Sequence, residues 1–495
     1  MAAELAARLA RAFGVQVDTA HVDDDGEPEE LFRAAEQLGR AIAERGGRAR
    51  PAVEQPWHAL PMRPDVAPAP RERTAATERL LAWARAAGAS WDGIDLHIDG
   101  RGNASVRVDR KLAAGEPVLR VPRRLMIVDN ELVRSSTGPV ALGFREPRPR
   151  DALAAWLALE MREPASQWRA FLDALPVQLA ELPMFRDPAD LAALAGTAAH
   201  AIAVEQARDV RDTYDRLAPE LRARLSLADF AWGCALVMSR AFHAPGTFEH
   251  RIAMVPIVDM FNHAIGDTTW TYDPLAGFVV ITERPFAPGD ELCFPYGDRS
   301  NTQLVVHYGF ALPGNPIAEA GLVFDRAADP VNDVAAHLMW KLPLDAPARI
   351  RVACLLDDRF LRARSLARLQ ACGPAERARA VAAGFAPHGD MPWLGAVVEH
   401  AAFDVLVAAA GRGLAELDAP RAADRPWART CAIVRDDERA VLAQLIEAIS
   451  ALREYLHWQD PARLRAAADA ISEDATGAQC LVRQCLQSLA DDLTA

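Results

Sequence analysis

Two segments of the chain concentrate the side chains that could do chemistry. The first is MVPIVDMFNH, residues 254–263, in which Asn262 and His263 come directly after a run of apolar residues. The second is ELCFPYGDRSNTQLVVHYGF, residues 291–310, in which a tyrosine–glycine turn at Tyr296 leads into a helix-like stretch. Taken singly, each has an ordinary explanation, either a strand that stops at a polar turn or an asparagine that caps a helix. Other stretches of the chain are needed to interpret the two segments together.

Histidine and cysteine give no sign of a metal centre. His243, His250 and His307 have no cysteine or carboxylate near them at zinc-ligand spacing, so we interpret them as structural or surface residues. The seven cysteines are scattered and lack the short paired spacings of zinc sites and disulfide frameworks. This pattern favours a reducing, cytoplasmic setting and no metal at the functional site.

Composition restricts the class of protein and its partners. A chain of 495 residues is too long for one hydrophobic core, and 51% hydrophobic with 25% charged residues is ordinary for a globular protein. The formal net charge of −13 argues against nucleic acid or an anionic membrane as the main partner. No apolar stretch approaches the roughly 20 residues of a membrane span. We therefore expect a monomer of two or three domains, with no nucleic-acid or membrane partner.

The N-terminal region is expected to differ from the remainder. Apolar residues recur at helical spacing from Leu5 to Phe13 and from Leu31 to Ile42, which predicts two amphipathic helices within an appendage over residues 1–50. Its role cannot be read from the sequence. Residues 51–72 are rich in proline and aperiodic, so they are predicted to form an extended linker.

Strand and helix patterns then alternate along the chain. Alternation over residues 94–98, and short apolar runs near 106–108 and 118–121, predict strands. Helical periodicity follows from about 151 to 242, with Ser226 as an N-cap near its end. β character returns between 253 and 294 in IAMVPIVDM, TTWTY, GFVVIT and ELCF, and after about 315 the chain is predicted to be helical with no further strands. The β region is therefore split by a long helical insertion.

Several stretches together resemble the SET methyltransferases of the plant Rubisco large-subunit methyltransferase type, over most of residues 80–456. DRKLAAGEPVLRVPRRLMI looks like the N-terminal SET segment of that family, and QWRAFLDALPVQLAELPMF with LSLADFAWGCALVMSRAF is similar to its helical insertion. DMFNH and YGDRSN…HYGF match its C-terminal SET signatures in order and approximate spacing. ARTCAIVRDDERAVLAQLIEAI looks like the tail of its helical substrate-binding domain.

This resemblance implies an α+β fold and a set of domains. The expected SET domain covers residues 73–315, with its helical insertion at about 151–235, and an all-helical substrate-binding domain covers 316–495. The family's cofactor pocket lies where the Asn-His and Tyr-Gly segments thread past each other in a knot-like arrangement, which is rare in proteins. S-adenosyl-L-methionine is the cofactor that the resemblance implies, and a protein or peptide is the substrate.

Carried over position by position, the resemblance assigns roles to individual residues. Tyr296 is expected to be the catalytic tyrosine, its hydroxyl joining the backbone carbonyls of Arg240 and Asp259 around the transferred methyl. The expected cofactor-binding residues are Asn103, Ser105, Arg240, Asp259, Asn262, His263, Tyr308 and Phe310. The expected substrate-binding residues are Ser239, Phe242, Val258, Trp270 and Tyr272.

The chemistry of methyl transfer favours lysine as the acceptor. An in-line displacement needs a neutral amine, whereas free lysine has a pKa near ~10.4 and is protonated at neutral pH. A narrow apolar channel and a neighbouring sulfonium both lower that pKa. A polar residue in place of Phe242 would suit an imidazole better, so lysine is preferred over histidine.

One departure from the family keeps other functions open. Its Gly-x-Gly turn, which lets backbone approach the cofactor, falls in register on Asn103, Ala104 and Ser105, whereas a literal Gly100-Arg101-Gly102 lies three residues early. Either the turn has slipped or asparagine and serine replace the glycines; asparagine tolerates left-handed geometry better than serine does. The alternatives are a non-catalytic SET-fold binding protein, or methylation of histidine, an N-terminus or a peptide natural product.

Overall fold

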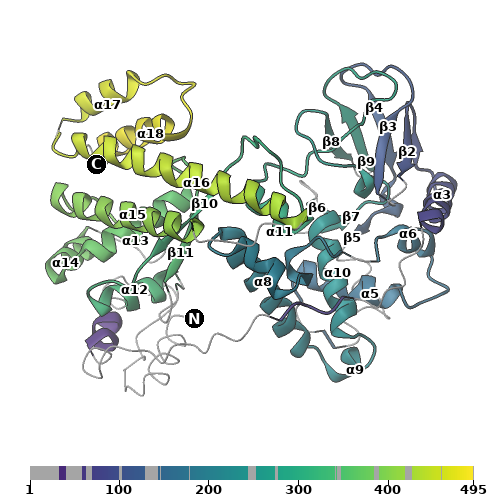
Figure 1. Ribbon diagram of the computed structural model, residues 1–495, viewed down its shortest axis with the longest axis horizontal. Helices are drawn as coiled ribbons and strands as arrows, with labels where there is room; N and C mark the ends of the chain where they lie inside the picture. Colours follow the sequence, from purple (N-terminus) through teal and green to yellow (C-terminus); the bar gives the residue numbers. More distant parts are fainter. Residues whose placement is uncertain are drawn as a thin grey trace.

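The structure is a computed structural model that describes residues 33–40, 58–62, 70–99, 103–128, 143–144, 147–177, 179–243, 252–273, 277–340, 342, 347–383, 390–418, 426–458 and 460–493. Figure 1 shows an elongated molecule with most of the strands at one end and helices α12 to α18 at the other. The long helix α16 extends from the C-terminal body toward α11 and α8, which lie between the two ends. No helix in these ranges is long and apolar enough to cross a membrane.

The first body is built from short antiparallel strands in three sheets. Their orders are β1-β4-β9-β8, β2-β3 and β5-β7-β6. The alternation predicted at residues 94–98 is confirmed, because Ile94 is buried while Asp95 and His97 are more exposed. The strands are β1 Ser90–Trp91, β2 Ile94–Ile98, β3 Ala104–Val108, β4 Pro117–Val121, β5 Ile127–Val128, β6 Ala241–His243, β7 Ile252–Met254, β8 Thr268–Asp273 and β9 Gly277–Thr282.

Two predicted strands are shorter than expected. In IAMVPIVDM only β7 is extended, and the chain then turns through a 3₁₀ helix, Val258–Met260, with Ile257 at a φ of 76°. Pro256 has no N–H to give to a ladder, which ends the strand. ELCF forms only isolated bridges, from Glu291 to Arg107 and from Phe294 to His263. Both departures occur in the segments that the sequence singled out for chemistry.

The predicted helical insertion is confirmed between β5 and β6. It contains helices α5 Pro149–Glu160, α6 Arg169–Ala174, α7 Pro188–Leu191, α8 Ala198–Asp215, α9 Pro219–Arg222 and α10 Leu227–Arg240. Ser226 caps α10 as expected, since its side chain accepts the Asp229 N–H at 3.1 Å. Helix α10 packs closely on α5 at Gly233, where a Cβ would lie 2.3 Å from the Ala154 carbonyl oxygen. This packing fixes the end of α10, which carries Arg240.

The C-terminal body is mostly helical, but the prediction of an all-helical domain was wrong. β10 Ala320–Phe324 and β11 Ala348–Val352 form an antiparallel pair. All five residues of β10 are buried, so its sequence lacks the alternation of apolar and polar residues that identifies a strand. Helix α11 Asn301–Tyr308 lies between the two bodies, and the helices of the C-terminal body are α12 Pro330–Trp340, α13 Asp358–Ala371, α14 Pro374–Ala382, α15 Ala396–Leu417, α16 Pro426–Leu452, α17 Pro461–Asp469 and α18 Gly477–Asp492.

The described parts of the N-terminal region pack against both bodies. Residues 33–40 are helical, and Ala34, Ala35 and Leu38 join the core of the C-terminal body. Within the predicted linker, Leu60 is 2% exposed and its N–H donates to the Met184 carbonyl. Helix α3, Pro70–Ala86, then leads into the first body. The helix predicted around Leu5–Phe13 lies outside the described residues, and the domain boundaries stay a prediction.

Candidate functional site

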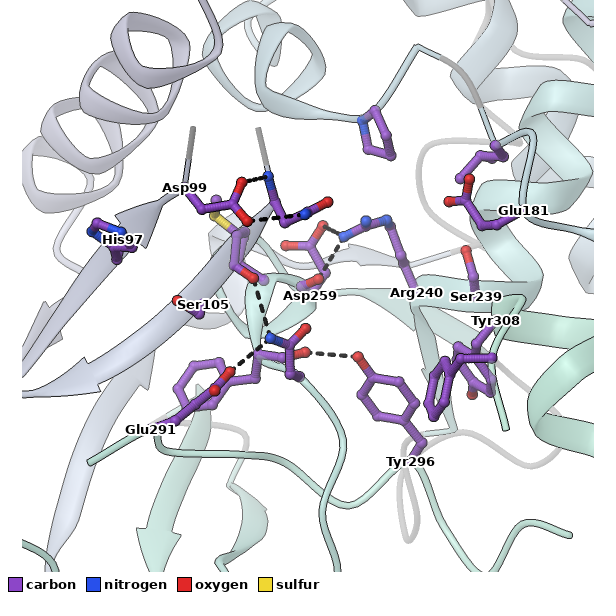
Figure 2. Close-up of a pocket in the computed structure, with 18 of the residues that line it drawn as sticks. His97, Asp99, Ser105, Glu181, Ser239, Arg240, Asp259, Glu291, Tyr296 and Tyr308 are labelled. Atoms are coloured by element: carbon purple, nitrogen blue, oxygen red, sulfur yellow. Dashed lines mark hydrogen bonds and ion pairs between the residues drawn. The ribbon is translucent and has the colours of Figure 1, made fainter. Parts of the chain in front are cut away.

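A cavity of about 700 Å³ opens where α3, the β2-β3 hairpin, the end of α10 and the segments 259–262 and 291–310 meet (Figure 2). Nine of the residues singled out from the sequence line it. They are Asn103, Ser105, Ser239, Arg240, Asp259, Asn262, Tyr296, Tyr308 and Phe310. The remaining five do not line it: Phe242, Val258, His263, Trp270 and Tyr272. Within the described residues, no group of three His, Cys, Asp or Glu side chains is arranged to hold a metal ion.

The two chemistry-bearing segments lie side by side at this cavity. The Phe294 N–H donates to the Asn262 carbonyl at 2.7 Å, and His263 forms a parallel bridge with Phe294. The Tyr296 N–H donates to His263 Nδ1 at 3.1 Å, and the two rings stack with centroids 4.9 Å apart. His263 therefore holds Tyr296 by backbone and ring, from outside the cavity.

The Tyr296 hydroxyl is a fixed and neutral donor. It donates to the Phe261 carbonyl oxygen at 2.7 Å. Burial raises the pKa of Tyr296 well above its ordinary value, so the hydroxyl keeps its proton at neutral pH. Tyr308 packs on the other side, with ring centroids 4.5 Å apart. The carbonyl that accepts this hydrogen bond is that of Phe261, which the sequence did not single out. The expected grouping of the hydroxyl with the Arg240 and Asp259 carbonyls around a methyl group stays a prediction.

His263 is itself poised to accept a hydrogen bond. Burial lowers the pKa of His263, which keeps its imidazole neutral at neutral pH. Nδ1 lies 3.1 Å from the Tyr296 nitrogen and 3.4 Å from the Phe294 carbonyl oxygen. A neutral ring with its proton on Nε2 accepts from the Tyr296 N–H, whereas a ring with its proton on Nδ1 donates to Phe294.

Charged groups at one end of the cavity are incompletely paired. Arg240 Nη1 donates to the Asp259 carbonyl at 2.5 Å and lies 3.3 Å from Asp259 Oδ2. Arg73 of α3 lines the same region, and burial together with the positive charge of Arg240 lowers the pKa of Arg73. Three buried atoms lack a hydrogen-bond partner among the described residues: Arg73 Nε, Arg240 Nε and Asp259 Oδ1. Buried polar atoms are normally paired, so these are available for a polar ligand.

At the other end, Asn262 is oriented by its neighbours. Its Nδ2 donates to Glu291 Oε1 at 2.7 Å and to the Ala104 carbonyl at 3.3 Å. Arg107 lies 3.7 Å from the Glu291 carboxylate and also lines the cavity. Since both amide hydrogens have acceptors, the amide oxygen of Asn262 is left to receive a hydrogen bond from a ligand.

The expected substrate-binding residues form an aromatic layer next to Tyr296. The Phe242 ring lies 5.5 Å from Phe278 and 5.4 Å from Phe294, and Trp270 stacks on Phe278 at 4.9 Å. Phe242, Trp270, Tyr272 and Tyr296 are partly buried against the same core cluster, in which Val258 is fully buried. Ser239 is in the cavity, but its hydroxyl donates to the Ala235 carbonyl. Their part in substrate binding stays a prediction.

Comparison with known proteins gives a consistent picture of the fold. No protein-family model matches the chain. Actin-histidine N-methyltransferase of Drosophila melanogaster is 28% identical over 323 residues, which is 58% of this chain and 59% of that protein. The Homo sapiens protein of the same name is 26% identical over 56% of this chain and 52% of its own length. The chain thus spans little more than half the length of the curated relatives that it matches.

Solved structures cover more of the chain. The crystal structure of the SET domain of LSMT bound to lysine and AdoHcy aligns with a TM-score of 0.61 at 17% identity, covering 78% of this chain and 93% of that one. Rubisco LSMT bound to AdoMet aligns with a TM-score of 0.58 and similar coverage. This chain has the SET-domain fold. The α+β class and the Rubisco-methyltransferase type of architecture expected from the sequence are confirmed.

Within this SET fold, the altered glycine turn is the clearest departure from the expected motif. Asn103 lies at the end of the β2-β3 hairpin, with its N–H and Nδ2 donating to the two oxygens of Asp99 at 2.8 and 3.0 Å. Its φ is not positive, since Ile257 is the one described non-glycine residue in the left-handed region. Asn103 therefore lacks the left-handed geometry that we considered for it, and the choice between a slipped turn and a replaced glycine stays a prediction. The literal Gly100-Arg101-Gly102 lies outside the described residues.

The sequence reasoning missed several cavity residues of the SET domain. Phe261 lies inside the quoted DMFNH motif, and Glu291 opens the second segment, so both could have been found by asking what faces Asn262 and Tyr296. Arg73 belongs to no motif, and it falls where the predicted linker gives way to α3. Asp99 and Glu181 also line the cavity from a hairpin and a loop of the insertion. Only the tertiary fold brings these residues to the site.

Proposed function

We propose that the chain is an S-adenosylmethionine-dependent protein N-methyltransferase that transfers a methyl group to a lysine side-chain amine. The observation that carries this proposal is the Tyr296 hydroxyl bonded to the Phe261 carbonyl, beside Asn262 and in the cavity lined by Arg240 and Tyr308. The tyrosine oxygen and the carbonyl oxygen together offer lone pairs at the wall of this mainly polar cavity. The SET fold supports the proposal, and it does so independently of these contacts.

The cavity suits the proposed cofactor chemically. S-adenosylmethionine carries an α-carboxylate, an α-ammonium, a ribose diol and an adenine, and it supplies a methyl group on a sulfonium. Arg73 and Arg240, each with an unpartnered Nε, would hold the carboxylate, because guanidinium groups bind carboxylates with charge-assisted hydrogen bonds. Asp259 Oδ1 would accept from the ammonium. Tyr308 and Phe310 offer flat apolar walls for the adenine.

The residues of this chain would then hold a neutral amine in line with the methyl carbon. Partly exposed Phe242, which packs on the buried rings of Phe278 and Phe294, would disfavour the charged ammonium and so lower the pKa of the lysine. Correct alignment of two reacting groups can contribute ~7–11 kcal/mol to a barrier reduction. The Tyr296 oxygen, whose proton is directed at Phe261, presents lone pairs that favour a partially positive carbon.

The most specific part of the proposal is the side chain that accepts the methyl group. The relatives named actin-histidine N-methyltransferase favour a second candidate, a histidine side chain. The apolar Phe242 and its ring neighbours favour lysine, because they offer no hydrogen-bond partner to orient an imidazole. Phe242→Asn is expected to shift activity from lysine toward histidine peptides.

The test measures binding first and transfer second. Calorimetry with S-adenosylmethionine should detect binding to the wild type, and no binding at millimolar cofactor would leave a non-catalytic SET-fold binding protein. Mass spectrometry of a lysate treated with wild type or Tyr296→Phe should find methyl groups on lysine that decrease in the variant. Methyl groups on histidine alone would transfer the proposal to the second candidate.

The low lysine content of the chain limits the background from self-methylation in this assay. It carries two lysines, Lys111 and Lys341, so methylation of the enzyme itself is confined to two peptides. A variant with both lysines changed to arginine is a control that should retain transfer to substrate. Loss of the lysine signal in that control would mean that the signal came from self-methylation.

A further inference from the structure

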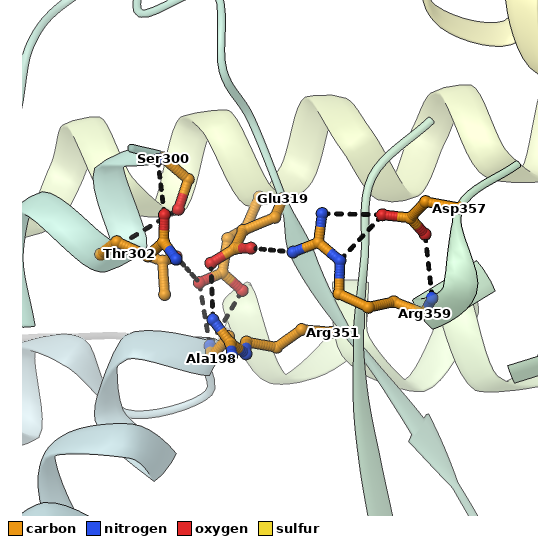
Figure 3. Close-up of polar contacts among 9 residues, drawn as sticks. Ala198, Ser300, Thr302, Glu319, Arg351, Asp357 and Arg359 are labelled. Atoms are coloured by element: carbon orange, nitrogen blue, oxygen red, sulfur yellow. Dashed lines mark hydrogen bonds and ion pairs between the residues drawn. The ribbon is translucent and has the colours of Figure 1, made fainter. Parts of the chain in front are cut away.

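A buried carboxyl group lies at the junction of the two bodies, remote from the cavity. Glu438 of α16 is 1% exposed and contacts the starts of α8 and α11. Figure 3 shows Ala198 and Thr302, which lie at those two helix starts, together with Glu319. Both of its oxygens accept the Ala198 N–H at the start of α8, at 2.9 and 3.0 Å. The Thr302 hydroxyl at the start of α11 donates to Oε1 at 3.2 Å. One side chain of the C-terminal body thus joins the first turns of two helices.

The charged groups around Glu438 pair with residues other than Glu438. Glu319, just before β10, is paired with Arg351 at 3.1 Å and with Arg359 at 2.6 Å. Asp437 accepts from Asn301 Nδ2 at 2.5 Å. None of the cations that the structure describes forms an ion pair with Glu438. Burial, with a smaller effect of the Glu319 charge, raises the pKa of Glu438 to about 7.

Helix α11 connects this junction to the candidate active site. Its first two residues, Asn301 and Thr302, contact Asp437 and Glu438 of α16. Its last residue, Tyr308, lines the cavity and packs against Tyr296. A helix of eight residues is only about 12 Å long and is stiff, so a shift at one end moves the other.

We propose that Glu438 is a positioning residue for the site: by joining α8 and α11 through Ala198 and Thr302, it fixes Tyr308 against Tyr296. Its effect on transfer rests on the function proposed above, whereas the junction itself does not. Ala198, Thr302 and the backbone N–H of Gly321 in β10 all donate toward Glu438, so the carboxylate satisfies them and the protonated acid does so only in part. The positioning is therefore complete when Glu438 is charged.

The same charge opposes folding, which gives the proposal a distinctive signature. The pKa of Glu438 is raised from an ordinary 4.5 to about 7 on folding, so its contribution to stability is fully present below 4.5 and is lost as pH rises through about 7. Activity should move the other way, because the charged form orients both donors. A merely structural residue would move stability and activity together.

The test compares wild type with Glu438→Gln, which keeps the shape and lacks the titration. The ratio of wild-type to variant kcat should be near one at about pH 6 and rise to roughly tenfold at about pH 8, since displacing a group near the reaction by about 1 Å can cost up to ~100-fold. Over the same range the unfolding free energy of the wild type should fall relative to that of the variant. A kcat ratio that stays flat with pH overturns the proposal, and so does a parallel fall in both quantities.

Two further variants keep the result interpretable. Glu447→Gln removes an exposed carboxyl from the same helix and should leave both pH profiles unchanged. Thr302→Val should lower kcat in the same direction, and combining it with Glu438→Gln should add little, because both act through one contact. If the wild type binds no S-adenosylmethionine, the proposed function fails. The pH-dependent stability difference between wild type and Glu438→Gln still reports on the junction in that case.

Discussion

Both bodies contain arginines with buried nitrogen atoms, and the surroundings of these arginines differ. In the C-terminal body, Arg368 and Glu399 are 2% and 1% exposed and form two hydrogen bonds of 2.7 and 2.9 Å, while a third bond joins Arg368 to the Met391 carbonyl. At the cavity, Arg73 and Arg240 each keep an unpartnered Nε, and Asp259 keeps an unpartnered Oδ1. The first arrangement is complete within the protein. The second leaves polar atoms of both charges without a partner, as the proposed cofactor site requires.

The difference teaches how a buried charge can be assigned to stability or to binding. Removing one member of a complete pair leaves an uncompensated charge in the core and should strongly destabilise the protein. Neutralising an incomplete cluster should cost little stability and much ligand affinity. The following substitutions test this distinction between charges that stabilise the fold and charges that bind a ligand, beginning with the largest expected effect.

Arg368→Met should destabilise the protein by about 3–5 kcal/mol, because Glu399 would stay buried without a cation. Denaturant unfolding gives the measurement. Arg465→Met, which breaks the exposed pair with Asp491, is the matched control and should cost less than about 1 kcal/mol. Cofactor affinity should be unchanged in both variants. A loss of only about 1 kcal/mol in Arg368→Met would mean that the buried pair is not what holds this core.

The double variant Arg240→Met/Asp259→Asn should show the opposite pattern. Its unfolding free energy should stay within about 1 kcal/mol of the wild type, since a buried ion pair replaced by neutral groups is often neutral for stability. The Kd for S-adenosylmethionine should rise roughly 10- to 100-fold, because hydrogen bonds to charged groups contribute about 1.5–3 kcal/mol. Arg284→Met/Asp267→Asn neutralises a pair outside the cavity and should leave Kd unchanged. Equal losses of affinity in both double variants would contradict the assignment.

The sequence revealed the parts of the site that lie in contiguous motifs. Asn262 and Tyr296 belong to segments whose polar residues directly follow apolar runs, and both line the cavity as predicted. Arg240 was assigned through the resemblance of LSLADFAWGCALVMSRAF to the family's helical insertion, and it is the last residue of α10. Such residues can be recognised from the sequence because residues that are neighbours in the chain at the end of a strand or helix are also neighbours in the folded site.

Residues outside those motifs could not be found in the same way. Arg73 is one arginine among several near the start of α3, and only the packing of that helix brings it beside Arg240. Strand β11 alternates buried Ile350 and Val352 with more exposed arginines, a pattern that could have been read. Strand β10 has no alternation at all, because both of its faces are covered.

The smallest expected effect concerns the N-cap of α10, the helix that ends at Arg240. Ser226 caps α10 at the end opposite Arg240, with its side chain accepting the Asp229 N–H and the Asp229 carboxylate accepting the Ser226 N–H. Ser226→Ala should cost about 1 kcal/mol of unfolding free energy, the usual loss for a removed cap.

Cofactor Kd should not change in Ser226→Ala, because the packing of α10 on α5 at Gly233 holds the helix independently of its cap. Calorimetry on the folded variant, with Thr197→Ala at the start of α8 as a second uncapped helix, provides the measurement. A raised Kd in Ser226→Ala alone would mean that the position of Arg240 depends on the whole length of α10. The unpaired charges of the cavity would then be held by long-range helix geometry, and not by the local contact between Arg240 and Asp259.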